Sequence, residues 1–88
     1  MRYEVVVNKK AYKGMKELPQ KESNIFALLL EDIAENGPVQ PAYRNYSKIG
    51  KDKYHCHLSY RYVACWELKR NTIIVEVYYV GSRESAPY

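Results

Sequence analysis

The sequence has few cysteines and no long apolar segment. Its 88 residues contain two cysteines, Cys56 and Cys65, which are too few for a disulfide framework. No apolar run approaches the roughly 18 residues of a membrane-spanning helix. The N-terminal segment also lacks the apolar core and the small-residue cleavage site of a signal peptide. We therefore expect a cytoplasmic protein with two free thiols and no association with a membrane.

Repeats, low-complexity tracts and linkers are also missing, so we expect one domain over residues 1–88. What the chain has in excess is tyrosine, with ten residues, and positive charge, with a formal net charge of +4. Positive charge attracts polyanions, and tyrosine rings suit base stacking as well as half-buried strands. Charge alone does not separate a protein that binds a polyanion from one that is merely basic.

The order of strand and helix patterns predicts an α+β fold. Helices are expected over residues 9–18 and 20–38, with Asn8 as the cap of the first and Gly37-Pro38 as the stop of the second. Strand patterns occur at 2–8, 46–49, 53–58, 61–68 and 72–80. The expected packed stripes of the helices are Ala11, Tyr12, Met15 and Leu18, then Ile25, Leu28, Leu29, Ile33 and Ala34. We expect the two helices to form a hairpin on one face of a mostly antiparallel sheet.

Alternation assigns the strand side chains to two faces of this sheet. The apolar sets should face the helices, and they are Tyr54, Cys56, Leu58, Tyr62, Ala64, Trp66 and Leu68, with Ile73, Val75, Val77 and Tyr79 sharing one face of the last strand. A three-residue loop over 58–60 keeps the first two sets together and opposes His57 to Arg61. His55, His57 and Arg61 then project from the helix-free face, with Lys53 beside them, as a basic cluster on an open surface.

Three interpretations of this cluster are possible. Histidines at i and i+2 can ligate zinc, with Cys65 or Glu67 as a third ligand on the same face. However, Cys65 is expected to oppose Lys53, about 7 Å along the strand from His55, and the nearby Lys53 and Arg61 would repel a cation. We therefore expect no metal. The second interpretation is that the histidines are ordinary solvated strand residues.

The third interpretation is acid–base chemistry on a phosphodiester. One imidazole can take a proton and another can give one near neutral pH. Arginine binds phosphate oxygens in a two-pronged contact and stabilises the charge that grows in the transition state. A 2′-hydroxyl of RNA can serve as the nucleophile, so this chemistry needs neither a metal nor another cofactor.

Three segments carry a resemblance to a known family: "KYHCHL", "YRYVACWEL" and "EVYYVGSRESAPY". Together with the order of strand, helical hairpin, basic turn and strand run, they resemble the RelE/ParE superfamily of bacterial toxin–antitoxin systems. The resemblance is strongest to the RelE branch of ribosome-dependent mRNA interferases and covers nearly the whole chain. It implies a RelE-like α+β fold and a cognate antitoxin as protein partner. The toxin is then a monomer alone or part of a hetero-oligomer with the antitoxin.

The resemblance also implies a set of site residues. His55 and His57 stand where the RelE branch commonly has two lysines, and other branches use histidines as acid and base. Arg61 and Arg83 match arginines expected to hold the scissile phosphate. Tyr88 matches a tail tyrosine that stacks on or orients a nucleotide, or assists as an acid. The residues expected to contact mRNA or ribosomal RNA are Lys48, Lys51, Lys53 and Tyr60.

The function expected from the sequence is that of a metal-independent endoribonuclease that blocks translation by cutting mRNA on the ribosome. The alternatives are a non-catalytic toxin of the ParE type, which inhibits DNA gyrase, and an inactive relative with the same fold. The full set of histidine, arginine and tyrosine favours the nuclease. The pattern leaves open which histidine is the base and which is the acid.

Overall fold

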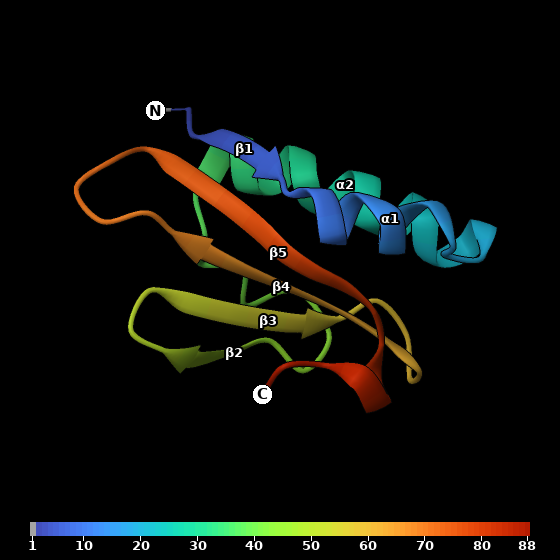
Figure 1. Cartoon of the computed structure of the whole chain (residues 1–88). Coiled ribbons are helices and arrows are strands. Elements are labelled where there is room, and N and C mark those ends of the chain that lie inside the picture. The colour runs from blue at the N-terminus through green and yellow to red at the C-terminus, as the bar shows by residue number, and fades with distance from the viewer. Residues whose placement is uncertain (1) are drawn as a thin grey trace.

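The structure is a computed structural model and describes residues 2–88 (Figure 1). Its elements, in chain order, are β1 (Glu4–Val7), α1 (Lys9–Lys16), α2 (Gln20–Asn36), β2 (Ser47–Gly50), β3 (Lys53–His57), β4 (Tyr62–Leu68), β5 (Ile74–Ser82) and a 3₁₀ turn, η1 (Arg83–Ser85). These elements match the expected order. In the described part of the chain, no helix is long and apolar enough to cross a membrane.

The five strands form one sheet in the order β1-β5-β4-β3-β2. β1 runs parallel to β5, and the other neighbouring pairs are antiparallel. Figure 1 shows α1 and α2 together on one side of the sheet, which leaves the other side free of helices. The predicted α+β plan, with a helical hairpin on a mostly antiparallel sheet, is confirmed.

Local signals in the sequence set the ends of both helices. The Asn8 side-chain oxygen accepts a hydrogen bond from the backbone N–H of Ala11 at 2.8 Å, which caps α1 as predicted. α2 ends at Gly37, whose φ of +94° disfavours any residue with a side chain. A Cβ at Gly37 would also lie 2.9 Å from the ring of Tyr3. This position therefore requires glycine for both backbone conformation and space.

The packed stripes of the helices are narrower than predicted. Tyr12 is 50% exposed and Leu28 is 54% exposed, so their predicted places in the stripes are wrong. The buried residues of α2 are Phe26, Leu29 and Ile33, which follow one another at spacings of three and four. Met15, Leu18, Ile25 and Leu30 are partly buried and pack against the same core.

Trp66 lies at the centre of the core between the helices and the sheet. Its side chain is fully buried in a cluster that includes Leu29 and Ile33, as the face assignment predicted. The indole N–H donates to the backbone oxygen of Pro38 at 2.9 Å, so the polar atom of this large side chain is satisfied. The ring of Tyr54 is stacked beside it, with ring centroids 6.3 Å apart.

The pairing of β3 with β4 is shifted from the prediction by two residues. His57 pairs with Val63 and not with Arg61, and His55 pairs with Cys65. The loop is longer than three residues, because the N–H of Leu58 bonds to the oxygen of Tyr62 at 2.8 Å. Side chains alternate with a period of two, so a shift of two residues leaves every side chain on its predicted face. The expected separation of Cys65 from His55, however, is wrong.

A β-bulge in β5 corrects the predicted face of Tyr79. Cys65 pairs with Tyr79 while the next residue, Trp66, pairs with Val77, so Tyr78 is an extra residue between them. Val75 and Val77 stay in the helix-covered core, but Tyr79 turns to the opposite face. Strict alternation had placed all three on one face.

Candidate functional site

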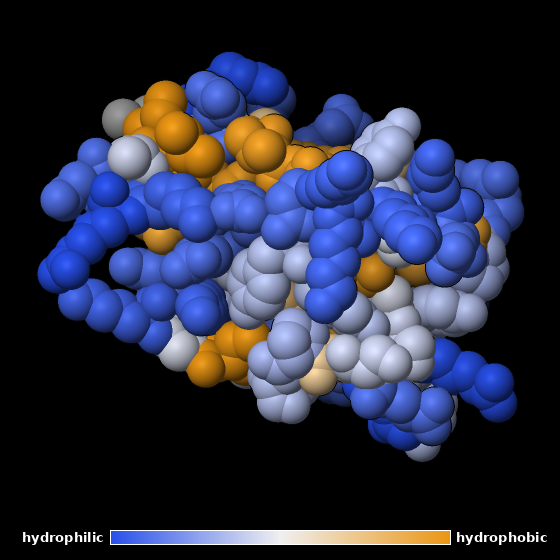
Figure 2. Space-filling view, in the orientation of Figure 1, coloured by the Kyte–Doolittle hydropathy of each residue, from blue (hydrophilic) through white to orange (hydrophobic). Residues whose placement is uncertain are grey.

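The helix-free face of the sheet is less open than the sequence predicted. Val63, Cys65 and Tyr79 form a second buried cluster there, and Ala86 of the C-terminal segment packs against it. Figure 1 shows this segment turning back from the end of β5 toward β3 and β2. In Figure 2 the larger apolar patch lies along β1, and a smaller one lies over β2 beside the C-terminal segment. The candidate site is therefore built under and beside the C-terminal segment.

His55 is buried at this site, with only 7% of its surface exposed. Its Nδ1 lies 3.0 Å from the hydroxyl oxygen of Ser47 on the neighbouring strand β2, and its ring centroid lies 4.6 Å from that of Tyr88. Burial lowers the pKa of His55 below its usual 6.5, and the nearby His57 lowers it further. The imidazole is therefore neutral at neutral pH and able to accept a proton.

His57 lies beside His55 on the same face, with ring centroids 5.7 Å apart. Its backbone N–H donates to the oxygen of Arg44 at 2.8 Å, which holds the end of β3 against the preceding loop. Its Nδ1 is buried and has no hydrogen-bond partner among residues 2–88. Most buried polar atoms are paired, so this buried nitrogen is an exception within the described residues.

Tyr88 connects the histidines to an arginine. Burial raises the pKa of the Tyr88 phenol above 10 and Cys65 adds to the rise, whereas the positive charge of Arg83 opposes it. The phenol is therefore protonated at neutral pH and able to donate a hydrogen bond.

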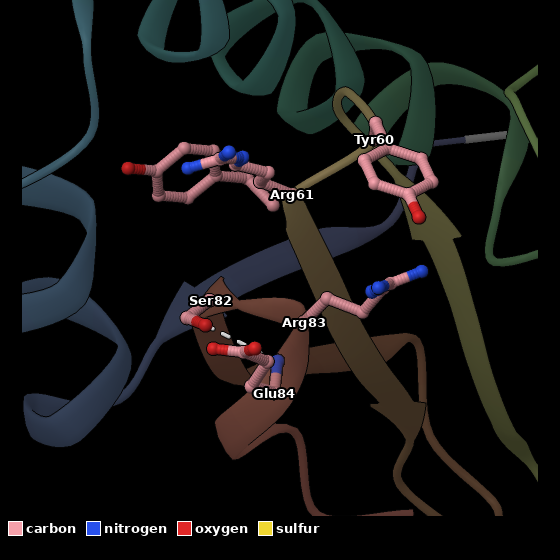
Figure 3. Close-up of a pocket in the computed structure, with 6 residues that line it drawn as sticks. Tyr60, Arg61, Ser82, Arg83 and Glu84 are labelled. Carbon is pink, nitrogen blue, oxygen red and sulfur yellow. Dashed lines mark hydrogen bonds between the residues drawn. The ribbon is translucent and has the colours of Figure 1, made fainter.

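Arg61 and Arg83 line one cavity of about 360 Å³ where β4 begins and β5 ends. The remaining residues around it are Tyr60, Tyr62, Ser82 and Glu84. The backbone N–H of Arg83 donates to the oxygen of Arg61 at 2.7 Å, which fastens η1 to the loop before β4. The guanidinium carbon of Arg83 lies 4.4 Å from the centroid of the Tyr60 ring, a cation–π contact. Figure 3 shows Arg83 directed toward Tyr60, whereas Arg61 points the other way.

The predicted site residues thus form two adjacent groups. The rings of His57 and Tyr88 each lie against that of His55, and Arg61, Arg83 and Tyr60 line the cavity. The residues predicted to contact RNA lie outside these contacts or at their edge: Lys48, Lys51 and Lys53 are exposed, and Tyr60 is 65% exposed.

Sequence reasoning missed Ser47 and Glu84. Ser47 pairs with His55 across β2 and β3, and Glu84 brings a carboxylate to the rim of the arginine cavity. A serine in a polar, turn-rich segment carries no signal of its partner, because the pairing register of a short edge strand is set by tertiary structure. The sequence shows Glu84 next to Arg83, but it does not show that the Glu84 side chain faces the cavity.

The structure also bears on the metal interpretation. Cys65 stands directly opposite His55 in the sheet, closer than expected. Burial raises the pKa of its thiol to about 12, so the sulfur stays protonated. Within residues 2–88, no three side chains of the His, Cys, Asp or Glu type are grouped so that they could hold a metal ion.

Comparison with known proteins shows similarity in structure but not in sequence. No protein-family model matches the chain, and no curated protein matches it in sequence. Among solved structures, the DinJ–YafQ toxin–antitoxin complex of E. coli matches with a TM-score of 0.77 at 12% identity, covering 100% of both chains.

Two further structures are similar over most of their length. A mutant of the E. coli toxin RelE in the free state matches with a TM-score of 0.75 at 20% identity, covering 98% of this chain and 88% of RelE. The YoeB dimer from Staphylococcus aureus matches with a TM-score of 0.73 at 13% identity, covering 94% of this chain and 99% of YoeB. The resemblance inferred from the sequence is confirmed at the level of the fold: this chain has the fold shared by the RelE, YoeB and YafQ toxins.

Proposed function

We propose that this protein is the toxin of a toxin–antitoxin pair and acts as an mRNA interferase that cleaves mRNA on the ribosome. The observation that carries the proposal is the return of the C-terminal segment to β3 and β4. This return sets Tyr88 against His55, with ring centroids 4.6 Å apart, and joins Arg83 to Arg61 by a backbone hydrogen bond of 2.7 Å. Metal-independent RNA cleavage needs a base, an acid and positive charge at the phosphate, and the histidines and arginines can supply these.

In the proposed reaction, one histidine removes the proton from a 2′-hydroxyl, whose oxygen then attacks the adjacent phosphorus. The bond from phosphorus to the 5′-oxygen breaks, and the other histidine gives a proton to that leaving oxygen. The lowered pKa of His55 favours it as the base, because its imidazole is neutral at the start. His57, whose ring centroid lies 5.7 Å from that of His55, is then the acid.

The arginines are proposed to bind the scissile phosphate. Arg83 and Arg61 line the same cavity. The Arg61 guanidinium, which points away from Arg83 in Figure 3, must turn toward it for both to contact one phosphate. The negative charge on these oxygens grows in the transition state, where guanidinium groups stabilise it most. Tyr60 and Tyr88 offer ring faces on which neighbouring bases can stack.

The proposal includes two macromolecular partners. Lys48, Lys51 and Lys53 are exposed on and beside β2 and β3, and we assign them to the phosphate backbone of mRNA or ribosomal RNA. An antitoxin is the second partner, since structures with the same fold include complexes with RelB and DinJ. The toxin is then a cytoplasmic protein, alone or in a hetero-oligomer with its antitoxin.

The test is cleavage of a defined mRNA by the purified protein on programmed ribosomes, with the cut sites mapped by primer extension. Wild-type protein should cut the mRNA only when ribosomes are present, and the double variant His55→Ala, His57→Ala should not cut it. Lys21→Ala is the matched control, because Lys21 is exposed on α2, away from the site. Intact mRNA together with inhibited DNA gyrase would instead establish a ParE-type toxin. Intact mRNA with active gyrase would indicate an inactive relative.

A further inference from the structure

A second cavity, of about 390 Å³, lies between α1 and the end of β5. We call it the α1 groove. Two lysines of the helix, Lys10 and Lys13, line it on one side, and the hydroxyl-bearing residues Ser82 and Ser85 line it on the other. None of these side chains belongs to the proposed catalytic set. The α1 groove therefore needs a separate explanation.

The α1 groove depends on a close approach of helix and strand. A Cβ at Gly14 would lie 2.1 Å from the backbone oxygen of Val80, so the helix backbone contacts the strand directly at this point. The start of α1 is also fixed, because the side-chain nitrogen of Asn8 donates to the Glu76 carboxylate on β5 at 2.9 Å. Lys10 and Lys13 are three residues apart and so share one helix face. The packing of Gly14 and Asn8 keeps that face beside the end of β5.

The α1 groove adjoins the arginine cavity. Tyr62 and Ser82 line both, so the two cavities meet at these residues. The hydroxyl of Tyr79 donates to the backbone oxygen of Ser82 at 2.6 Å and holds the chain in place where they meet. A strand of nucleic acid whose phosphate lies in the arginine cavity can therefore continue past Ser82 to Lys10 and Lys13.

The charges along this path favour a polyanion. Lys10, Lys13, Arg61 and Arg83 bring four positive charges to the two cavities, against the negative charges of Glu17 and Glu84. Lysine and serine side chains are common partners of phosphate oxygens. The ring of Tyr62, at the junction, offers a surface on which a base can stack.

We propose that the α1 groove binds the phosphodiester backbone of single-stranded mRNA beside the cleaved phosphate, with Lys10 and Lys13 as the phosphate contacts. This inference rests on the proposed function, because it places the flanking part of the same substrate. It extends the RNA-contacting surface from β2 and β3 to the opposite end of the sheet. Glu17 weakens binding at the outer end of the groove.

The test measures binding without cleavage, by fluorescence anisotropy with 2′-O-methyl RNA, whose blocked hydroxyl cannot attack. The variant Lys10→Ala, Lys13→Ala should bind an RNA of about nine nucleotides roughly five- to tenfold more weakly than wild type. Its salt-dependence slope should fall by about 1.4, which corresponds to two single-strand phosphate contacts. A trinucleotide is too short to fill both cavities, so the same variant should bind it as wild type does.

The matched control is Lys9→Ala, Lys16→Ala, which removes the same charge from the same helix outside the groove lining. The Lys16 ammonium lies 5.3 Å from the centroid of the Tyr12 ring, away from the groove. This control should bind the longer RNA within about twofold of wild type, since distant exposed charges are screened. Glu17→Gln should bind it more tightly than wild type, because it removes a negative charge.

Several results would overturn the inference. One is an equal loss of RNA binding in both lysine pairs, which would mean a non-specific charge effect. A second is that the variant Lys10→Ala, Lys13→Ala binds vacant ribosomes more weakly but binds the oligonucleotide as wild type does. This result would assign the two lysines to ribosomal RNA. A third is that the same variant loses binding to a hexaglutamate peptide but keeps its binding to RNA. This result would assign the groove to an acidic protein segment.

The outcome for the groove is distinguishable from the outcome for cleavage. If wild-type protein does not cut mRNA but groove-dependent RNA binding is observed, the proposed nuclease fails and the groove inference stands. If mRNA is cut while Lys10 and Lys13 have no effect on binding, the groove inference fails alone.

Discussion

At the residue scale, the chemistry depends on two imidazoles with different surroundings. His55 is covered by Tyr88 and held by Ser47 at 3.0 Å, whereas His57 has an unpartnered buried nitrogen. Environments that differ in this way can give two identical side chains different roles in proton transfer. Arg83 has an equally specific environment, because its guanidinium lies over the ring of Tyr60.

Arg83 is expected to act mainly on the transition state. Arg83→Ala should slow single-turnover cleavage on programmed ribosomes by on the order of 10²-fold, as the loss of one charge-stabilising donor typically does. Ribosome affinity should fall far less, since other basic residues share the backbone contacts. Arg83→Lys should restore the rate only in part, because an ammonium cannot make a two-pronged contact.

The rates and affinities of these two variants are to be compared with wild type. Wild-type cleavage by Arg83→Ala would remove Arg83 from the catalytic set. An equal fall in binding and cleavage would make it a docking residue.

The lowered pKa of His55 predicts a loss of stability in mild acid. The unfolded chain takes up a proton at His55 near its usual pKa of 6.5, whereas the folded protein does so only at lower pH. The unfolded state therefore binds more protons in this window, and the free energy of unfolding should decrease as the pH falls below about 6.5. The groups that face His55 are His57, Tyr88, Ser47 and Cys65.

Urea denaturation at a series of pH values between about 7.5 and 5 measures this effect, with His55→Gln as the comparison. The glutamine variant should lose less stability over the same range, and NMR titration of the imidazole should give the pKa directly. An NMR pKa above 6.5, or the same pH dependence in both proteins, would contradict the assigned environment.

At the element scale, strand pairing decides which side chains meet. The bulge at Tyr78 turns Tyr79 toward the helix-free face, where its hydroxyl bonds to Ser82 at 2.6 Å. The same bulge leaves Val80 in the helix-covered core, directly against Gly14 of α1. One extra residue in β5 thus connects the packing of α1 with the position of the C-terminal segment.

Trp66 is the central contact between the sheet and α2. Trp66→Ala should lower the free energy of unfolding by about 3–5 kcal/mol, through lost burial and the cavity that remains. Trp66→Phe should cost less, because it keeps most of the apolar volume and loses chiefly the bond to Pro38. Chemical denaturation gives both values, with Tyr12→Ala as the control because Tyr12 is half exposed. A Trp66→Ala protein as stable as this control would contradict the central role of Trp66.

At the scale of the whole molecule, the charge balance is basic. The chain has a formal net charge of +4, and some of its lysines and arginines occur on α1, β2, β3 and the C-terminal segment. The proposed substrate is a polyanion whose phosphates contact basic side chains on these elements. The described elements enclose one main core and one smaller cluster, on opposite faces of the same sheet.

The proposed reaction uses imidazole, guanidinium and phenol groups alone, which predicts how the whole protein responds to chelators. A chelator of transition metals that leaves Mg²⁺ on the ribosome should change neither the cleavage rate nor the melting temperature. Elemental analysis of the purified protein accompanies this measurement. Stoichiometric zinc that disappears in His55→Ala, or activity that zinc restores after chelation, would contradict the prediction.

The faces of the strands were predictable because their cause is local. Side chains alternate along an extended chain, so the sequence placed Trp66 toward the helices and both histidines on the other face. Those assignments are correct although the predicted pairing of β3 with β4 is not, because a shift of two residues leaves each side chain on the same face. The prediction for Tyr79 failed because a bulge interrupts the alternation, and no residue type in "EVYYVG" requires one.

The sequence by itself determined the order of elements, the helix caps, the basic charge and the inventory of groups available for chemistry. These follow from periodicity and from the properties of single residues. Only the tertiary structure decided that Ser47 meets His55, that Tyr88 covers it, and that Arg83 lies over Tyr60 and not beside the Arg61 guanidinium. Such contacts join segments far apart in the chain, and they depend on strand register, one bulge and the path of the C-terminal segment. Those features are set by packing of the whole molecule, because no local preference is strong enough to select them.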